Sequence, residues 1–108
     1  MSRDYRLFLE DMVDCCNKIL RFTKDLSFET FIADERTYDA VIRNLEVIGE
    51  AITHIPSEVQ SGRPDIQWRK IKSLRDILIH EYFGIDQDIV WDVVTNKVAV
   101  LIKELQKI

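Results

Sequence analysis

The chain has 108 residues, of which 46% are hydrophobic and 31% are charged, and its formal net charge is −4. This balance is typical of a single folded globular domain spanning residues 1–108, and it excludes a disordered chain. The acidic total argues against a protein that coats nucleic acid through a basic surface. With only three glycines and two prolines, the chain lacks the turn residues of a β-sandwich.

The sequence contains no signal for a membrane. No apolar run approaches the ~20 residues that a membrane span needs. The N-terminal stretch MSRDYRLFLEDM has scattered charges, so it does not predict a signal peptide. Cys15 and Cys16 are adjacent, which suits neither a zinc site nor a CxxC redox pair. We interpret them as free thiols in a reducing cytoplasm, one buried and one near the surface.

The first predicted element is a long helix from about residue 3 to residue 23. Its apolar residues recur at steps of three and four, the period of one helix face: Tyr5, Phe8, Met12, Cys15, Ile19 and Phe22. Ser2 is the expected N-cap, and Asp4 would lie near the positive end of the helix dipole. A short helix of one or two turns is expected between Ser27 and Ala33.

A second long helix follows and ends before Pro56. Its stripe has the same period and comprises Tyr38, Val41, Leu45, Ile48, Ile52 and Ile55. Gly49 lies inside this helix, where it costs about 1 kcal/mol relative to alanine, so we expect another backbone to approach it closely. Residues 57–64 are expected to form a connector with at most one helical turn.

Two further helices complete the pattern. We expect Asp65 to cap the third long helix, which carries Trp68, Ile71, Leu74, Leu78 and Ile79, and Gly84 to end it. Asp86 opens the last helix, with the stripe Val90, Val94, Val98, Leu101, Leu105 and Ile108. The sequence therefore predicts an all-α, antiparallel up-and-down bundle of four main helices and one or two short ones.

The apolar stripes of the first two long helices are wider than one small bundle can bury. Additional apolar residues flank them: Leu7, Leu9, Cys16, Leu20, Ile42, Val47 and Ala51. We therefore expect a homodimer that forms through one of these two helices.

Polar residues that can handle phosphate lie near the end of the third long helix, in the stretch RDILIHEYFGID. Five residues of helix rotate a side chain by about 140°, so Arg75 and His80 do not share a face. Asp76 lies four residues before His80 and does share its face. Two copies of this helix that met across a symmetry axis could combine these groups in one cleft.

The chemistry that fits this set is phosphodiester cleavage in RNA without a metal ion. RNA supplies its own nucleophile, the 2′-hydroxyl, and a histidine can take that proton or give one to the leaving oxygen. An arginine stabilises the added charge on the phosphoryl oxygens with a fork geometry that lysine lacks. His54 and His80 lack the i, i+4 spacing of a helical zinc pair, so we predict no metal and no cofactor.

Each of these residues also has a structural interpretation. Arg75 could pair with Glu46 and Glu50, His80 could stabilise a helix end, and Tyr82 could belong to the core. The exposed basic patch that could contact RNA, or simply be solvated, comprises Arg69, Lys70 and Lys72. The remaining candidates are expected to be structural, with His54 near a helix C-terminus and Trp68 and Trp91 as packing residues.

The chain resembles a known family. Arg75, His80 and Tyr82 match the RxxxxHxY signature of HEPN-domain toxins, and the chain resembles the HepT-like ribonucleases of bacterial toxin–antitoxin pairs. The stretches RTYDAVIRNLEVIGEA, PDIQWRKI and HEYFGID followed by IVW are also similar to that family. The resemblance therefore covers nearly the whole chain.

This resemblance implies a HEPN-like homodimer that cleaves RNA without metal in a cleft between protomers. Arg75 and His80 would be catalytic, and Asp76 would be a supporting residue at a position where asparagine is also common. The partner would be a nucleotidyltransferase antitoxin that attaches AMP to Tyr82, as in a type VII-like system. The AMP group would block RNA by its bulk and its charge.

Two functions stay open on the sequence alone. The chain could be the ribonuclease itself, or a non-catalytic helical partner of a nucleotidyltransferase. The complete set of Arg75, His80 and Tyr82 favours the enzyme, because a member that no longer cuts RNA would be expected to have lost one of them. A purely structural helical dimer would leave these polar residues unexplained.

Overall fold

The computed structural model describes residues 3–80 and 84–108, and within these ranges all regular structure is helical. In chain order the elements are α1 (Tyr5–Thr23), α2 (Phe28–Ala33), α3 (Glu35–Ile52), α4 (Ser57–Ser61), α5 (Trp68–His80), α6 (Gln87–Asp92), the π-helical turn η1 (Val93–Lys97) and α7 (Val98–Leu105). The last three continue one another and are called here the C-terminal helix, residues 87–105. The predicted pattern of long and short helices is therefore confirmed.

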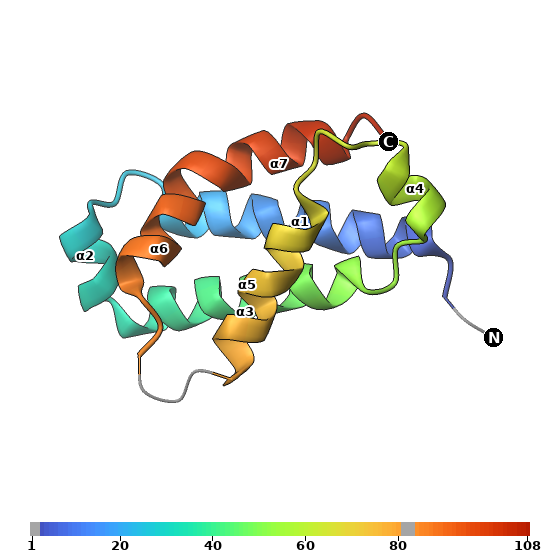
Figure 1. The fold of residues 1–108 in the computed structure, drawn as a ribbon. Coiled ribbons are helices and arrows are strands. Elements are labelled where there is room, and N and C mark those ends of the chain that lie inside the picture. The colour runs from blue at the N-terminus through green and yellow to red at the C-terminus, as the bar shows by residue number, and fades with distance from the viewer. Residues whose placement is uncertain (1–2, 81–83) are drawn as a thin grey trace.

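The long helices pack around one hydrophobic core. Helix α1 packs against α3 and α7 and runs in the opposite direction to both, while α5 packs across α3 at a steep angle (Figure 1). The bulkiest fully buried side chains come from α1, α2, α3 and the C-terminal helix: Phe31, Met12, Ile19, Ile48, Val41, Val90 and Val98. Trp68 and Leu78 of α5 are buried in the same core. The core thus fixes the position of α5, which carries the predicted site.

Polar side chains begin four of these helices, as N-caps do. Ser27 accepts a hydrogen bond from the Thr30 amide at 3.1 Å, and Asp86 accepts one from the Asp88 amide at 2.9 Å, which confirms both predicted starts. Asp34 caps α3 in the same way. The predicted cap Ser2 lies outside the described residues, and Asp4 caps α1 because its carboxylate reaches the Arg6 amide at 2.9 Å.

The start of α5 differs from the prediction. Asp65 lies in a turn, and α5 begins only at Trp68. The Asp65 carboxylate pairs with the Arg63 guanidinium at 2.7 Å. Asp65 is therefore an ion-pair acceptor and not a helix cap.

Burial on α1 is broader than the predicted single stripe. Cys15 and Cys16 are both buried, with exposed fractions of 5% and 0%, so the prediction that one thiol lies near the surface is wrong. Phe22, predicted to be in the stripe, is 36% exposed, while Leu9 is buried. The reason is that α3 and α7 both pack on α1, and two neighbours cover a wider arc of a helix than one.

The C-terminal helix contains a π-helical turn that the sequence pattern did not predict. A π turn holds more residues than an α turn, so it shifts the following side chains around the helix axis. The buried residues accordingly continue at steps of four before the last step of three: Val90, Val94, Val98, Ile102 and Leu105. Leu101 is only half-buried and Ile108 is 44% exposed, whereas both were predicted to be in the core.

The connection from α5 to α6 contains Gly84, which was expected to end α5. Gly84 has φ +147°, a backbone conformation that residues with a side chain rarely adopt. Helix α5 is described as far as His80, so whether Gly84 is its C-cap lies outside the described residues. Among the helices in the described part of the chain, none is both long and apolar enough to span a membrane.

Candidate functional site

Helix α5 carries Arg75, Asp76 and His80 in its second half. Its first residue, Trp68, is buried, and the indole N–H donates a hydrogen bond to the Arg63 carbonyl at 3.0 Å. Further along, Leu78 is also buried in the core. Apolar contacts therefore hold α5 at its start and within the stretch between Arg75 and His80.

The structure describes the backbone of Arg75 and His80 but not the side chains that would carry out the predicted chemistry. The side chains of Arg75 and His80 lie outside the described part of the structure, as does Tyr82 as a whole. Asp76 is exposed on the surface of α5. The roles of these four residues therefore stay predictions.

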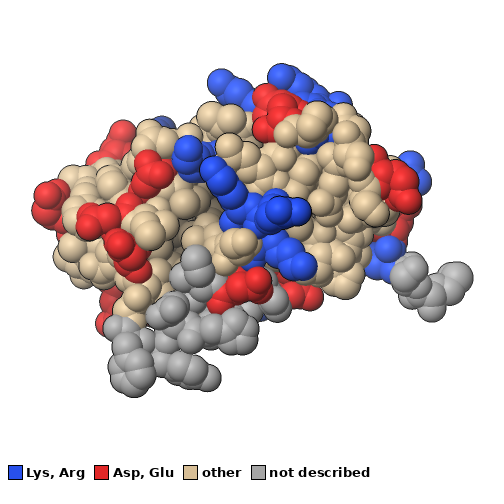
Figure 2. Space-filling view, viewed as in Figure 1, with Lys and Arg blue, Asp and Glu red and all other residues tan. Residues whose placement is uncertain are grey.

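The basic patch is exposed on the first two turns of α5. Arg69, Lys70 and Lys72 all have exposed side chains. Figure 2 shows lysine and arginine gathered in a band across the middle of this face, over α5, while aspartate and glutamate gather at the end where α2 and α6 lie. On this face a chain with net charge −4 thus presents a positive band. Helix α5, which also carries the backbone of Arg75 and His80, contributes to it.

A groove of about 570 Å³ lies between α5 and the C-terminal helix. We call it the α5–α7 groove. Its lining includes Arg69, Lys70 and Leu74 on α5, and Ile89, Val93, Asn96, Lys97, Val100 and Leu101 on the C-terminal helix. Two of the predicted RNA contacts therefore line this groove, whereas Lys72 is not part of the lining.

The sequence pattern did not lead us to predict that the C-terminal helix forms one wall of this groove. The signal was present, because Ile89, Val93, Lys97 and Val100 recur at steps of three and four beside the buried stripe. A second stripe of this kind is recognisable only when the first is known to face the core.

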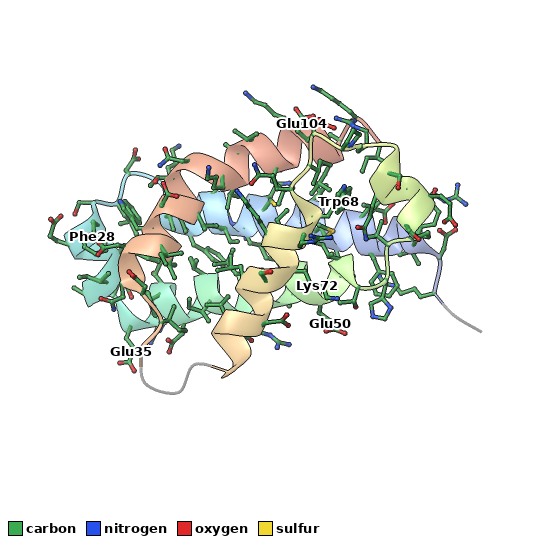
Figure 3. All side chains as sticks on the ribbon, viewed as in Figure 1. Phe28, Glu35, Glu50, Trp68, Lys72 and Glu104 are labelled. Atoms are coloured by element: carbon green, nitrogen blue, oxygen red, sulfur yellow. The ribbon has the colours of Figure 1, made fainter. Side chains whose placement is uncertain are left out.

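An ion-pair cluster lies at the end of the groove where α5 begins. The Arg63 guanidinium contacts the carboxylates of Asp65 at 2.7 Å and Glu104 at 2.5 Å, and both carboxylates belong to residues that line the groove. Figure 3 places Trp68 at the start of α5 and Glu104 near the end of α7. The Arg63 guanidinium holds the pKa of the Asp65 carboxyl well below its usual range, chiefly through hydrogen bonding.

The other predicted residues have structural contacts. The His54 imidazole stacks on the Phe8 ring, with centroids 4.3 Å apart, and its Nε2 lies 3.5 Å from Glu50 Oε1 in the last turn of α3. Trp91 packs on Phe31 with ring centroids 5.1 Å apart. These contacts, with the burial of Trp68, agree with the predicted packing roles. Among the side chains that the structure describes, which do not include that of His80, no group of three or more His, Cys, Asp or Glu residues could hold a metal ion.

Comparison with known proteins identifies the family. A family model described as Ribonuclease HepT-like matches residues 12–108. The chain belongs to the HepT-like ribonuclease family. The matched range contains α5, the α5–α7 groove and every residue of the predicted site.

Two relatives of this HepT-like chain are covered by the match over most of their length. One is named "Putative RNase MJ0127", from Methanocaldococcus jannaschii, and is 45% identical over 107 residues, which cover 99% of this chain and 88% of the relative. Another is named "Probable ribonuclease HepT", from Thermococcus cleftensis, and is 39% identical over 108 residues, which cover 100% of this chain and 98% of the relative. No solved structure matches the chain significantly.

Proposed function

We propose that this chain is a metal-independent endoribonuclease, the toxin of a toxin–antitoxin pair. The observation that carries the proposal is the HepT-like family match, which runs through α5 and includes Arg75 and His80 in the RxxxxH spacing. The names of the relatives, which describe ribonucleases, support the same reaction class.

The proposed reaction is attack of the RNA 2′-hydroxyl on the adjacent phosphorus. A bond forms between phosphorus and the 2′-oxygen while the bond to the 5′-oxygen of the next nucleotide breaks. His80 would take the 2′-hydroxyl proton or give one to the leaving 5′-oxygen. Arg75 would stabilise the added charge on the phosphoryl oxygens, and Asp76 would support the pair. The products would be a 2′,3′-cyclic phosphate and a 5′-hydroxyl.

The active unit is proposed to be a homodimer. Arg75 and His80 are separated by about 140° of rotation on α5, so one helix directs them to different sides. A cleft between the α5 helices of two copies would let both residue types reach one phosphate, with an arginine and a histidine supplied across the symmetry axis.

RNA would approach along the basic patch on α5. Lys72 is exposed, lies outside the lining of the groove and is about two turns of helix before His80. We therefore expect Lys72→Ala to weaken RNA binding and to reduce the slope of log affinity against log salt by ~0.7, the contribution of one contact to single-stranded nucleic acid. Lys18→Ala, at an exposed lysine on α1, is the matched control and should change neither quantity.

The silencing step is proposed to be attachment of AMP to Tyr82 by a nucleotidyltransferase antitoxin. The added phosphodiester would place a negative charge and an adenine next to the residues that receive RNA. Co-expression with a nucleotidyltransferase, followed by mass spectrometry, should find AMP on Tyr82, and Tyr82→Phe should stay toxic. A neutralised toxin with unmodified Tyr82 would mean that the antitoxin acts by binding alone.

The cleavage test uses purified wild type, Arg75→Ala and His80→Ala on a defined RNA in the presence of EDTA. Wild type should cut and leave 2′,3′-cyclic phosphate ends, and both variants should lose activity by a factor of at least ~100. His54→Ala and Arg36→Ala replace a histidine and an arginine elsewhere on the bundle, and both should retain activity. If wild type leaves RNA intact but binds a nucleotidyltransferase, the chain is the non-catalytic partner instead.

A further inference from the structure

A second hollow, of about 680 Å³, lies where the start of α1 meets the turn after α3, at the end of the bundle that carries the N-terminus (Figure 1). We call it the α1–α3 pocket. Its volume is within the range of pockets that hold small molecules. No described residue lines both this pocket and the α5–α7 groove. The proposed cleavage therefore leaves the α1–α3 pocket unexplained.

Three flat side chains line the α1–α3 pocket, and they are Tyr5, Phe8 and His54. The His54 imidazole stacks on the Phe8 ring with an angle of 9° between the two planes. The Arg3 guanidinium also lies over the Phe8 ring, 4.6 Å from its centroid. The His54 side chain is nevertheless 47% exposed, so another ring can stack on the face that Phe8 does not cover.

Two arginines at the start of α1 bring positive charge to the α1–α3 pocket. Arg3 and Arg6 both line it, and the Arg6 side chain is 74% exposed. Arg3 directs two N–H donors to Asp11, which is not part of the lining, and Arg6 directs two to Asp4. Because a guanidinium has five such donors, each arginine retains donors for an anion.

Asp4 is the acidic residue among the described residues that line the pocket. Its carboxylate accepts hydrogen bonds from the Arg6 guanidinium at 3.0 Å and from the Arg6 amide at 2.9 Å, and these bonds lower the pKa of Asp4. Two arginines and one aspartate give the lining a net charge of +1 with His54 neutral, on a chain whose net charge is −4. The charges of the lining thus favour an anionic ligand.

A nucleoside phosphate combines the two groups that this lining can bind. A base stacks on flat rings, and a phosphate accepts charge-assisted hydrogen bonds from guanidinium groups. We propose that the α1–α3 pocket binds a nucleoside phosphate, with the base against Tyr5 and His54 and the phosphate held by Arg3 and Arg6. This binding site goes beyond the proposed function and does not rest on it.

Calorimetric titration of the full chain with AMP tests the class of ligand. AMP should bind with a Kd below about 1 mM. Adenosine lacks the charge and inorganic phosphate lacks the base, so each should bind at least about tenfold more weakly than AMP. Either probe binding as tightly as AMP would overturn the proposal, as would no binding of AMP.

Arg6→Ala tests the phosphate contact. It should raise the Kd for AMP about tenfold, the scale of losing one hydrogen bond to a charged group. Arg21→Ala is the matched control, because Arg21 is also an exposed arginine of α1 that lies over a ring, 5.3 Å from the Phe22 centroid, but is not part of the lining. This control should leave the Kd unchanged, and equal losses in both variants would contradict a site at the pocket.

Asp4→Asn should change AMP binding in the opposite direction, which a loss of folding cannot do. Asparagine caps a helix about as well as aspartate, so α1 should still begin at the same place. The substitution removes the negative charge from the lining and releases donors of Arg6, so the Kd for AMP should fall about threefold. Asp14→Asn, at an exposed acidic residue of α1 outside the lining, should have no effect. Weaker binding by a folded Asp4→Asn chain would refute the predicted charge balance.

Tyr5→Leu tests the contact with the base. Leucine can still pack on the core as Tyr5 does, but it offers no ring. The Kd for AMP should rise about fivefold or more, while the weaker binding of inorganic phosphate should not change. Phe22→Leu, at a ring of α1 outside the lining, is the control and should bind AMP normally. An equal loss for AMP and for phosphate would argue against stacking of the base.

Two further measurements locate the nucleotide and identify its source. Arg75→Ala should bind AMP as wild type does, and loss of binding there with Arg6→Ala unaffected would place AMP in the proposed catalytic cleft and overturn the inference. A nucleotide within RNA carries the same groups as free AMP. A short 2′-O-methylated RNA, which lacks the attacking hydroxyl, distinguishes the two sources, because Arg6→Ala should weaken its binding only if a nucleotide of RNA occupies the pocket.

This inference and the proposed function can fail separately. A chain that cuts RNA but binds no AMP overturns the inference alone. A chain that binds AMP through Arg6 but cuts no RNA overturns the proposed function alone. Circular dichroism on every variant checks that a change in binding does not come from unfolding.

Discussion

Arg63, in the connector before α5, forms an ion pair with Glu104 of α7 at 2.5 Å, across 41 positions of sequence. The same guanidinium nitrogen contacts Asp65 at 2.7 Å, and the Arg63 carbonyl accepts the hydrogen bond of the Trp68 indole. One residue thus joins the start of α5 to α7. It thereby fixes one end of the α5–α7 groove.

Arg63→Ala should lower the thermal unfolding midpoint by several degrees. The substitution leaves the Asp65 and Glu104 carboxylates close together without the cation that both contact, and it frees the start of α5 from α7. Arg36→Ala, at an exposed arginine on α3, is the control and should shift the midpoint much less. Equal midpoints for the two variants by calorimetry would contradict a structural role for Arg63.

Stability should fall in acid, partly through Asp65. Its pKa is lowered in the folded chain, chiefly by the hydrogen bonds from Arg63. Because the pKa of Asp65 is lower in the folded chain, its stabilising contribution is fully present above the unfolded-state pKa of about 3.9. This contribution is lost as the pH falls through the folded-state pKa. Asp65→Asn should therefore be less stable than wild type at neutral pH and decline less steeply below about pH 4. Denaturant titrations across this pH range measure the stability of both proteins. Parallel profiles of stability against pH for wild type and Asp65→Asn would refute this role of Asp65.

Phe31→Ala should be among the most destabilising single substitutions. Phe31 is fully buried and packs on Tyr38 and Trp91, with ring centroids 5.4 Å and 5.1 Å away. It thereby joins α2 to α3 and to the C-terminal helix. The cavity should cost about 3–5 kcal/mol in the free energy of unfolding, measured by denaturant titration. Phe22→Ala, at a residue that is 36% exposed, should cost about 1 kcal/mol or less.

Both cysteines should be unreactive in the folded chain. Burial raises the pKa of the Cys16 thiol to about 12, and burial also raises the pKa of Cys15. The thiolate is the reactive form, so iodoacetamide at neutral pH should label neither residue in the native protein and both in denaturant. Rapid labelling of Cys15 in the native state would restore the original expectation of one surface thiol.

The helical bundle could be predicted from the sequence because the signals for each helix are local. Apolar residues at steps of three and four, Ser27 and Asp86 as N-caps, and Pro56 after the second long helix depend only on neighbours in the chain. The same local spacing places Arg75 and His80 on one helix. In the proposed enzyme, their arrangement around a phosphate would depend on a second copy, and no local pattern contains that information.

Which side chains are buried depends on contacts between distant segments, and only the tertiary structure decided it. Both α3 and α7 cover α1, so Cys15 and Cys16 are buried together and Phe22 is left partly exposed. Helix α7 ends at Leu105, so Ile108 lies beyond it and is left outside the core. The sequence by itself determined where the helices lie and which side of each is apolar, because helix periodicity is local. The tertiary structure decided how wide each buried face is and where the groove opens, because burial depends on how many neighbours pack on a helix.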